Sequence, residues 1–274
     1  MTGWWQRLRP LPVSDMPRLQ DPRLLFVHIP KTAGSTLDRI IEREYDRAAV
    51  LRLYGDLDAG LAALRSRDDA DRRALRAVVG HFGMGLGDEL PGASAYLTIL
   101  RDPVERIISH YHYVKARQHD RGHARALEGV RSLEEYVTAS AFASIVNDGQ
   151  ARLLGSRIGA AAVPADDATL ARALAALDRD DVVVGVQDRF DEFVLLACRA
   201  FGWGWPAYRR ENVGVARPRA AELPGSTIAL IREHNARDVV LYEAARARVA
   251  RDLARLPDPA GQLETVRLAA RWPS

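Results

Sequence analysis

The chain has 274 residues, of which 47% are hydrophobic, and it carries a formal net charge of +3. This length suits one large α/β domain or a core domain with helical additions, and the hydrophobic content excludes a globally disordered chain. The small net charge argues against a nucleic-acid-binding protein, which would cluster an excess of basic residues.

Neither a disulfide nor a membrane span is expected. Cys198 is the single cysteine and lies in an apolar run, so we interpret it as a buried, inert thiol. No apolar run approaches the ~18 residues needed to span a membrane. The first residues include Trp4 and Trp5 but no apolar segment typical of a secretory signal. We therefore expect a cytoplasmic protein with an N-terminal tail over residues 1–22.

The first predicted elements form a strand, a turn and a helix. Residues 24–29 are a short apolar run typical of a buried strand, and residues 30–35 form a turn. Apolar residues then recur at helical spacing from about Ser35. This order is the opening of a βαβ unit.

Further strands and helices alternate along the chain. Strands are predicted at residues 77–80, 96–100 and 182–186, and helices from Pro103, over residues 190–201 and over residues 235–256. Residues 132–177 read mainly as helices, with a loop near 157–167. Asn235 and Asp238 resemble a capping pair.

This pattern predicts the fold class and the domain organisation. We expect an α/β fold with a P-loop-like, mostly parallel sheet flanked by helices, and additional helices in the second half. One domain would cover residues 23–256, and residues 257–274 would form a C-terminal tail.

The strongest local signal is a polar loop between the first strand and its helix. A helix start presents backbone N–H groups and a favourable dipole to an anion. Lys31 adds a point charge, and Gly34 lets the backbone approach closely. The candidate anion-binding residues are Pro30, Lys31, Thr32, Ala33, Gly34, Ser35 and Thr36. The alternative is that Ser35 or Thr36 simply caps the helix. The loop is not a Walker A motif, because Lys31 precedes the glycine.

A second candidate anion site follows the strand at residues 96–100. Arg101 ends this strand, and Ser109 lies about two helical turns further on. Because ligands bind at the carboxyl ends of strands in open α/β sheets, both sites are expected at one edge. Two anion sites there suit a nucleotide that carries phosphates at both ends of its ribose.

The two segments together resemble the PAPS-dependent sulfotransferases, especially the carbohydrate branch that includes the heparan sulfate 2-O-sulfotransferases (PAPS is 3′-phosphoadenosine 5′-phosphosulfate). Residues 30–35 look like that family's loop for the 5′-phosphosulfate, and residues 101–106 with Ser109 look like its 3′-phosphate segment. Residues 147–153 and 184–191 are also similar to family segments. The resemblance implies PAPS as co-substrate, PAP as product, and Arg101 and Ser109 as ligands of the 3′-phosphate.

His81 is the candidate general base. It follows the strand at residues 77–80 and precedes a glycine-rich turn, and the resembling family carries its base in a Gly-His pair after a strand. Lys31 would neutralise charge on the leaving oxygen. The alternative for His81 is a hydrogen-bonded histidine at a strand end. Asp88 or Glu89 are acidic alternatives for the base.

The acceptor is a hydroxyl-bearing molecule, for which a glycan is expected from the resemblance. Two features bear on it: a basic stretch and a pair of tryptophans. The basic stretch comprises Lys115, Arg117, Arg121 and Arg125, and it either guides an acidic glycan or is a solvated face. Trp203 and Trp205 either stack on a sugar or pack in the core.

Two other functions remain open from the sequence: a nucleotide-dependent small-molecule kinase, or a catalytically inactive nucleotide- or glycan-binding homologue. A kinase would need Mg²⁺ and carboxylates to hold it. We predict no metal site, because His119 and His123 have ligand-like spacing without an evident third ligand.

Overall fold

A five-stranded parallel sheet forms the centre of the protein, in the strand order β2-β3-β1-β4-β5. The computed structural model describes residues 22–117, 119–120, 123–124, 127–139, 143–159, 163–208 and 218–271. The strands are β1 (Arg23–Val27), β2 (Val50–Leu53), β3 (Ala77–Gly80), β4 (Ser94–Leu100) and β5 (Val182–Val186). Within these residues the α/β fold class expected from the sequence is confirmed.

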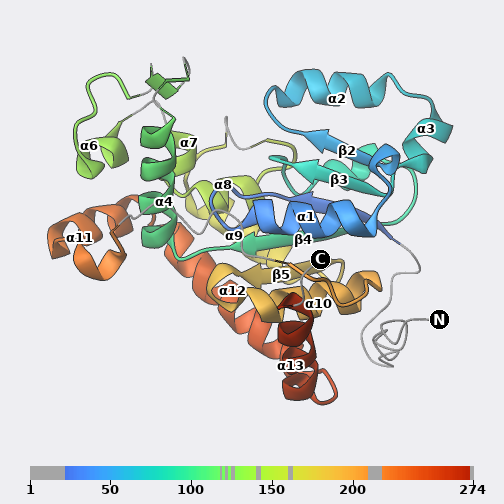
Figure 1. Cartoon of the computed structure of the whole chain (residues 1–274). Coiled ribbons are helices and arrows are strands. Elements are labelled where there is room, and N and C mark those ends of the chain that lie inside the picture. The colour runs from blue at the N-terminus through green and yellow to red at the C-terminus, as the bar shows by residue number, and fades with distance from the viewer. Residues whose placement is uncertain are drawn as a thin grey trace.

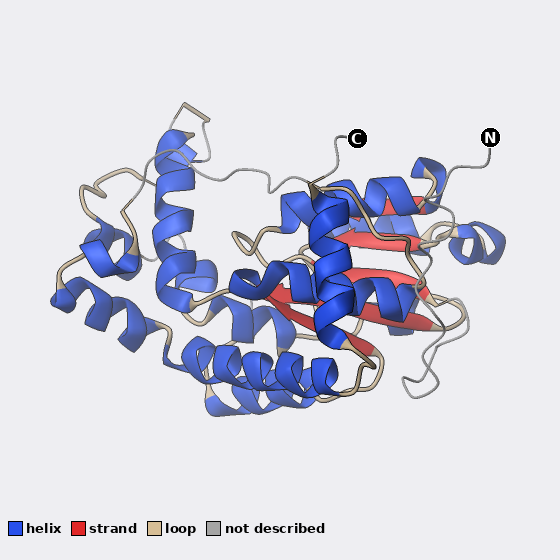
Figure 2. Cartoon of the chain, turned by 60° about the horizontal axis from the view of Figure 1, so that its bottom comes forward, coloured by secondary structure: helices blue, strands red, loops and turns tan. Residues whose placement is uncertain are grey.

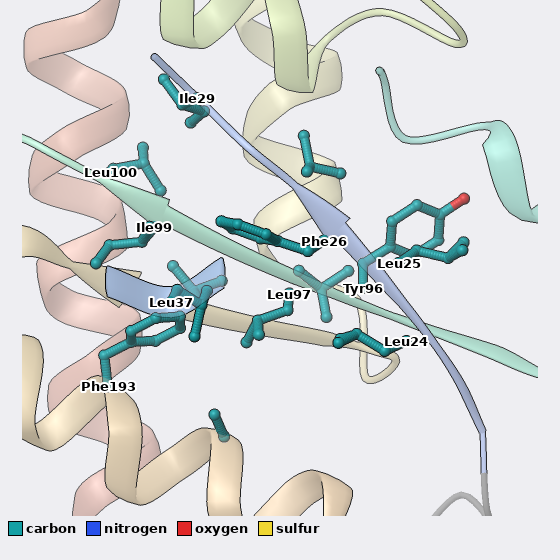
Figure 3. Close-up of a cluster of buried hydrophobic side chains, with 14 of the residues drawn as sticks. Leu24, Leu25, Phe26, Ile29, Leu37, Tyr96, Leu97, Ile99, Leu100 and Phe193 are labelled. Carbon is teal, nitrogen blue, oxygen red and sulfur yellow. The ribbon is translucent and has the colours of Figure 1, made fainter. Parts of the chain in front are cut away.

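The interior strands are mostly apolar because the sheet is covered on both faces. β1 and β3 are buried at every position. Helices lie on both sides of the sheet (Figure 2). Figure 3 shows the resulting core, in which Phe26, Leu97 and Ile99 from the sheet lie near Leu37 of the first helix and Phe193 of a later helix.

The helices of the first half connect the first three strands. They are α1 (Gly34–Glu44), α2 (Leu57–Arg65) and α3 (Asp69–Ala74). Leu37, Ile40 and Ile41 form the buried face of α1, as the helical spacing predicted. Figure 1 shows α2 and α3 beside the edge strand β2.

A second hydrophobic cluster lies near the carboxyl end of β4. It joins α4 (Pro103–Ala116), α6 (Leu133–Thr138) and α11 (Gly225–His234), on the left of Figure 1. Tyr136 and Ile231 are fully buried in it. Because α4 leaves β4 directly after Arg101, this cluster fixes the position of the second candidate anion segment.

Apart from α11, six further α-helices follow α6 in the described part of the chain. They are α7 (Ala143–Val146), α8 (Gly149–Leu154), α9 (Asp167–Leu177), α10 (Phe190–Phe201), α12 (Ala236–Ala254) and α13 (Pro259–Ala270). Helices α9, α10 and α12 pack against β5. Residues 257–274, expected to form a tail, include α13, whose Val266 is fully buried and which packs on α10. The predicted N-terminal tail lies almost entirely outside the described residues.

The sequence missed one strand, and one prediction about local structure is wrong. The edge strand β2 was not predicted, and Asn235 and Asp238 are not a capping pair. The Asn235 side-chain amide donates to the Val146 carbonyl at 2.7 Å and makes no cap hydrogen bond. The start of α12 is instead capped by Asp148, whose Oδ1 accepts from the N–H groups of Arg237 and Asp238 at 2.9 and 3.0 Å.

Candidate functional site

Three neighbouring strands deliver the candidate site residues to one edge of the sheet. β1 lies between β3 and β4, and Val27 near its end is in register with Gly80 of β3 and Thr98 of β4. The His28 N–H donates to the Gly80 carbonyl at 2.8 Å, so the ladder extends just past the strand. The segments that follow these strands, which begin at His28, His81 and Arg101, therefore lie side by side.

The polar loop after β1 opens α1 without a side-chain cap. The N-cap residue is Ala33, with φ 77°, and Lys31 also has a positive φ of 70°. No side chain makes the cap hydrogen bond there, so the alternative in which Ser35 or Thr36 caps the helix is wrong. The first N–H groups of an uncapped helix start face outward and suit an anion.

The hydroxyl groups of the loop differ in their orientation. Thr32 is fully buried and its hydroxyl donates to the Ile29 carbonyl at 2.8 Å, which closes the turn. Thr36 is also buried, whereas Ser35 is exposed. Of the three hydroxyls predicted to face an anion, that of Thr32 is thus used within the loop itself. Pro30 is half-buried at the start of the turn.

Gly34 is required by the ring of His28. A Cβ added at Gly34 would lie 1.9 Å from His28 Nε2. The His28 ring also stacks on Phe26, with centroids 5.2 Å apart. The glycine therefore allows the His28 ring to lie close to the helix start, a role that the sequence did not reveal. The close approach of the backbone to an anion stays a prediction.

His28 is held by a hydrogen-bonded chain that the sequence did not reveal. Tyr54 donates its hydroxyl proton to Asp38 Oδ2 at 3.1 Å, so its oxygen accepts from His28 Nδ1–H at 2.7 Å. Arg52 pairs with the other oxygen of Asp38 at 3.3 Å. Burial lowers the pKa of His28 to about 3, which keeps this ring neutral.

His81 has a defined tautomer. Its Nδ1 lies 2.6 Å from the His28 carbonyl oxygen, which can only accept, so Nδ1 carries the proton and Nε2 keeps its lone pair. Burial lowers the pKa of His81, an effect that the hydrogen bond to His28 and the charge of Asp38 partly oppose. A neutral imidazole with an accepting Nε2 is the form that can act as a general base.

The acidic alternatives to His81 lie elsewhere. Glu89 forms a bidentate pair with Arg65 at 2.9 and 3.0 Å, and Asp88 pairs with Arg157 at 2.9 Å. The adjacent Gly87 N–H donates to the hydroxyl of Tyr96, near the amino end of β4. The two carboxylates are therefore remote from the carboxyl edge and are held by arginines.

Arg101 joins the second candidate segment to the first. Its guanidinium donates to the Lys31 carbonyl at 3.1 Å and lies 3.4 Å from Glu105. Its backbone N–H and carbonyl are both bonded to the side chain of Gln150, each at 3.0 Å. Ser109, on α4, is half-buried two turns further along. The two anion segments predicted from the sequence are thus in direct contact through Arg101.

An aromatic side chain of α4 faces the loop. The Lys31 ammonium lies 4.0 Å from the centroid of Tyr113, and the Arg117 guanidinium lies 4.2 Å from the same ring. Tyr113 is one helical turn after Ser109, so both share one face of α4. Tyr113 was not predicted as a site residue, although its spacing of four residues from Ser109 was a signal available in the sequence.

The tryptophans belong to the core rather than to this edge. Trp203 is 3% exposed, stacks on Phe201 and donates to the Tyr45 hydroxyl at 3.2 Å. Tyr45 follows the carboxyl end of α1, about 16 Å from the loop at its start. Trp205 lies near Arg199, with a ring-to-guanidinium distance of 5.7 Å. The packing alternative for Trp203 is therefore correct.

The other predicted features have mixed outcomes. Lys115 lies over the Tyr111 ring at 5.7 Å, and Arg121 and Arg125 fall outside the described residues. His123 pairs with Asp120. Among the residues that the structure describes, no group of His, Cys, Asp and Glu could hold a metal ion. Within the same residues, every helix is too short or too polar to cross a bilayer.

In comparisons with known proteins, one protein-family profile matches part of the chain. A profile described as the sulfotransferase family matches residues 18–152, a range that includes the loop, His81, Arg101 and Gln150. Among solved structures, a sulfotransferase from Alicyclobacillus acidocaldarius is 18% identical, covers 81% of this chain and 94% of its own, and aligns with a TM-score of 0.41. No curated protein matches the chain. The profile match supports sulfonyl transfer as the general class of reaction; the heparan sulfate 2-O branch is not shown.

Proposed function

We propose that this protein transfers the sulfonyl group of PAPS to a hydroxyl of an acceptor, with a carbohydrate as the expected class. The observation that carries the proposal is the meeting of three segments at one sheet edge: an uncapped helix start with Lys31, an arginine bonded to that loop, and a histidine with an accepting Nε2. Each meets one requirement of the reaction: donor binding at two ends, and proton removal from the acceptor.

On the donor side, the loop at residues 30–36 would bind the 5′-phosphosulfate. The N–H groups at the start of α1 would hold its oxygens, and the Lys31 ammonium would neutralise the charge that develops on the leaving 5′-phosphate. Arg101 and Ser109 would bind the 3′-phosphate. The contact between Arg101 and the Lys31 carbonyl supports one continuous donor site.

On the acceptor side, His81 Nε2 would accept the hydroxyl proton. The acceptor oxygen forms a bond to sulfur as the bond between sulfur and the 5′-phosphate oxygen breaks, and PAP leaves. Because burial lowers the pKa of His81, the neutral form needed for this step prevails near pH 7. Lys31 and Arg117 both contact the Tyr113 ring. Tyr113 and Arg117 would contribute to the acceptor side, where a cation suits an acidic glycan.

The donor assignment is tested by comparing nucleotides in a thermal-shift experiment. A ligand that binds only the native state stabilises it by ~2.7 kcal/mol at a hundredfold excess over its Kd. PAP is expected to raise the Tm, and AMP and ATP, which lack the 3′-phosphate, are expected to raise it much less. Equal shifts by PAP and AMP would remove the case for the 3′-phosphate site. An acceptor screen with labelled PAPS follows.

A further inference from the structure

Gln150 lies in a segment that resembles the sulfotransferases but has no role in the proposal above. It is fully buried at the start of α8, and both ends of its side-chain amide contact the backbone of a single residue, Arg101. Its Oε1 accepts from the Arg101 N–H, and its Nε2 donates to the Arg101 carbonyl, each at 3.0 Å. The side chain thus continues the hydrogen bonding of β4 by one residue, where the strand ends at Leu100.

Gln150 is itself fixed by a buried carboxylate. Asp238 accepts from the Gln150 N–H at 3.1 Å and from the Ala151 N–H at 2.8 Å. It also pairs with Arg106 at 3.2 Å, and both side chains of this pair are essentially unexposed. Arg106 also donates to the Ile145 carbonyl at 2.7 Å. The pair therefore links α4 and α12 to the start of α8, and its bonds limit the freedom of the glutamine to reorient.

The arrangement determines where the Arg101 guanidinium points. The backbone of Arg101 is held by Gln150 from one side, and its side chain is held by the Lys31 carbonyl and Glu105 from the other. A small rotation of the held backbone would displace the guanidinium, and loss of one hydrogen bond between a charged group and its ligand weakens binding by about tenfold to 100-fold.

We propose that Gln150 is a positioning residue for the 3′-phosphate site, acting through Arg101 to select nucleotides that carry a 3′-phosphate. The inference rests on the proposed function, because it assumes that Arg101 binds this phosphate. It assigns Gln150 no contact with the donor.

The test uses Gln150→Met, which keeps the volume of the side chain and removes both hydrogen bonds. The Kd values of PAP and AMP are measured for the full chain by calorimetry. The affinity for PAP should fall by about tenfold to 100-fold, whereas the affinity for AMP should change little. Thr169→Val is the matched control, since it removes a fully buried hydroxyl that accepts from Arg172 at 2.8 Å and leaves Arg101 untouched. The control should keep the wild-type ratio of the two Kd values.

A double-mutant cycle with Arg101→Ala distinguishes an effect through the position of Arg101 from a general destabilisation of the fold. Without the guanidinium, Gln150→Met should change the PAP affinity by less than about twofold. If the Met variant does not fold, Gln150→Glu, which keeps the acceptor for the Arg101 N–H and loses the donor, is used in the same comparison.

The outcomes separate this inference from the proposed function. If the wild-type protein does not prefer PAP to AMP, the proposed function fails. If the wild type does prefer PAP and the Gln150 variants keep that preference, the positioning role is wrong. It is also wrong if Gln150→Met weakens PAP and AMP binding equally, or weakens PAP binding as much in the Arg101→Ala background.

Discussion

At the scale of single residues, His28 has two functions in the candidate site. Its carbonyl oxygen fixes the tautomer of His81, and its ring fills the space that Gly34 leaves beside the helix start. The ring is tied through Tyr54 to Asp38, whose charge acts on His81. The protonation of the candidate base therefore depends on a carboxylate that it does not touch.

Replacing Asp38 should change the pH dependence of the reaction. The charge of Asp38 favours the imidazolium form and raises the pKa of His81, so Asp38→Asn should lower that pKa further. Because the neutral imidazole is the active form, the acidic limb of the kcat/KM profile should move to lower pH. Glu42→Gln is the control, since Glu42 also pairs with Arg52, at 2.9 Å, but is largely exposed. An unmoved acidic limb in Asp38→Asn would contradict the electrostatic link.

At the scale of elements, the start of α1 requires a residue without a side chain at position 34. Gly34→Ala would place a methyl group against the His28 ring, and overpacking of this kind costs about 1–3 kcal/mol. We expect a lower Tm and weaker PAP binding. Gly225→Ala is the matched control, because Gly225 also begins a helix and an added Cβ there would meet nothing within 4 Å. Equal Tm values for the two variants would show that the His28 ring moves aside freely.

The start of α12 depends on a cap from another helix. Asp148 is 2% exposed and accepts from two N–H groups of α12 and from the Arg237 side chain. Asp148→Ala should lower the free energy of unfolding by more than the ~1 kcal/mol typical of a lost N-cap. Asp56→Ala removes the exposed cap of α2 and should stay near that value. Denaturant unfolding of both variants gives the comparison, and a smaller loss at Asp148 would refute this account.

The burial of each element determined whether the sequence could predict it. The strands β1, β3, β4 and β5 have apolar runs because they are largely buried, whereas β2 escaped prediction because it is an edge strand that is mostly half-exposed and contains Arg52. The loop at residues 30–36 and Arg101 could be predicted as site residues because each follows the end of a predicted strand. Gln150 lies in a segment noted for its resemblance to the sulfotransferases, but neither its role nor that of Tyr54 could be predicted. Their bonds to Arg101 and His28 join positions that are 49 and 26 residues apart.

At the scale of the whole molecule, the strand order explains why distant motifs meet. The chain leaves β1 for β2 and β3 on one side of the sheet, then crosses to β4 and β5 on the other. The loop after β1 therefore lies at the reversal of strand order, where open α/β sheets bind ligands. Alternating elements predicted the parallel sheet, but hydrophobic periodicity carries no information on strand order, so the contact between Arg101 and the loop required the structure.

Lys31 and His81 have separate roles in the proposed reaction: Lys31 binds the donor, and His81 removes the proton from the acceptor. Lys31→Ala should weaken PAP binding and slow turnover together. In His81→Ala, by contrast, the proton acceptor is lost while the donor loop is intact, so the two properties should separate.

The decisive measurement is therefore the Kd of PAP and the single-turnover rate of His81→Ala, taken with the acceptor that the screen identifies. The account predicts a Kd close to that of the wild type and a rate lower by ~100-fold or more, the usual scale for a lost general base. A folded His81→Ala protein with near-normal turnover, or one that loses PAP binding along with its activity, would contradict it.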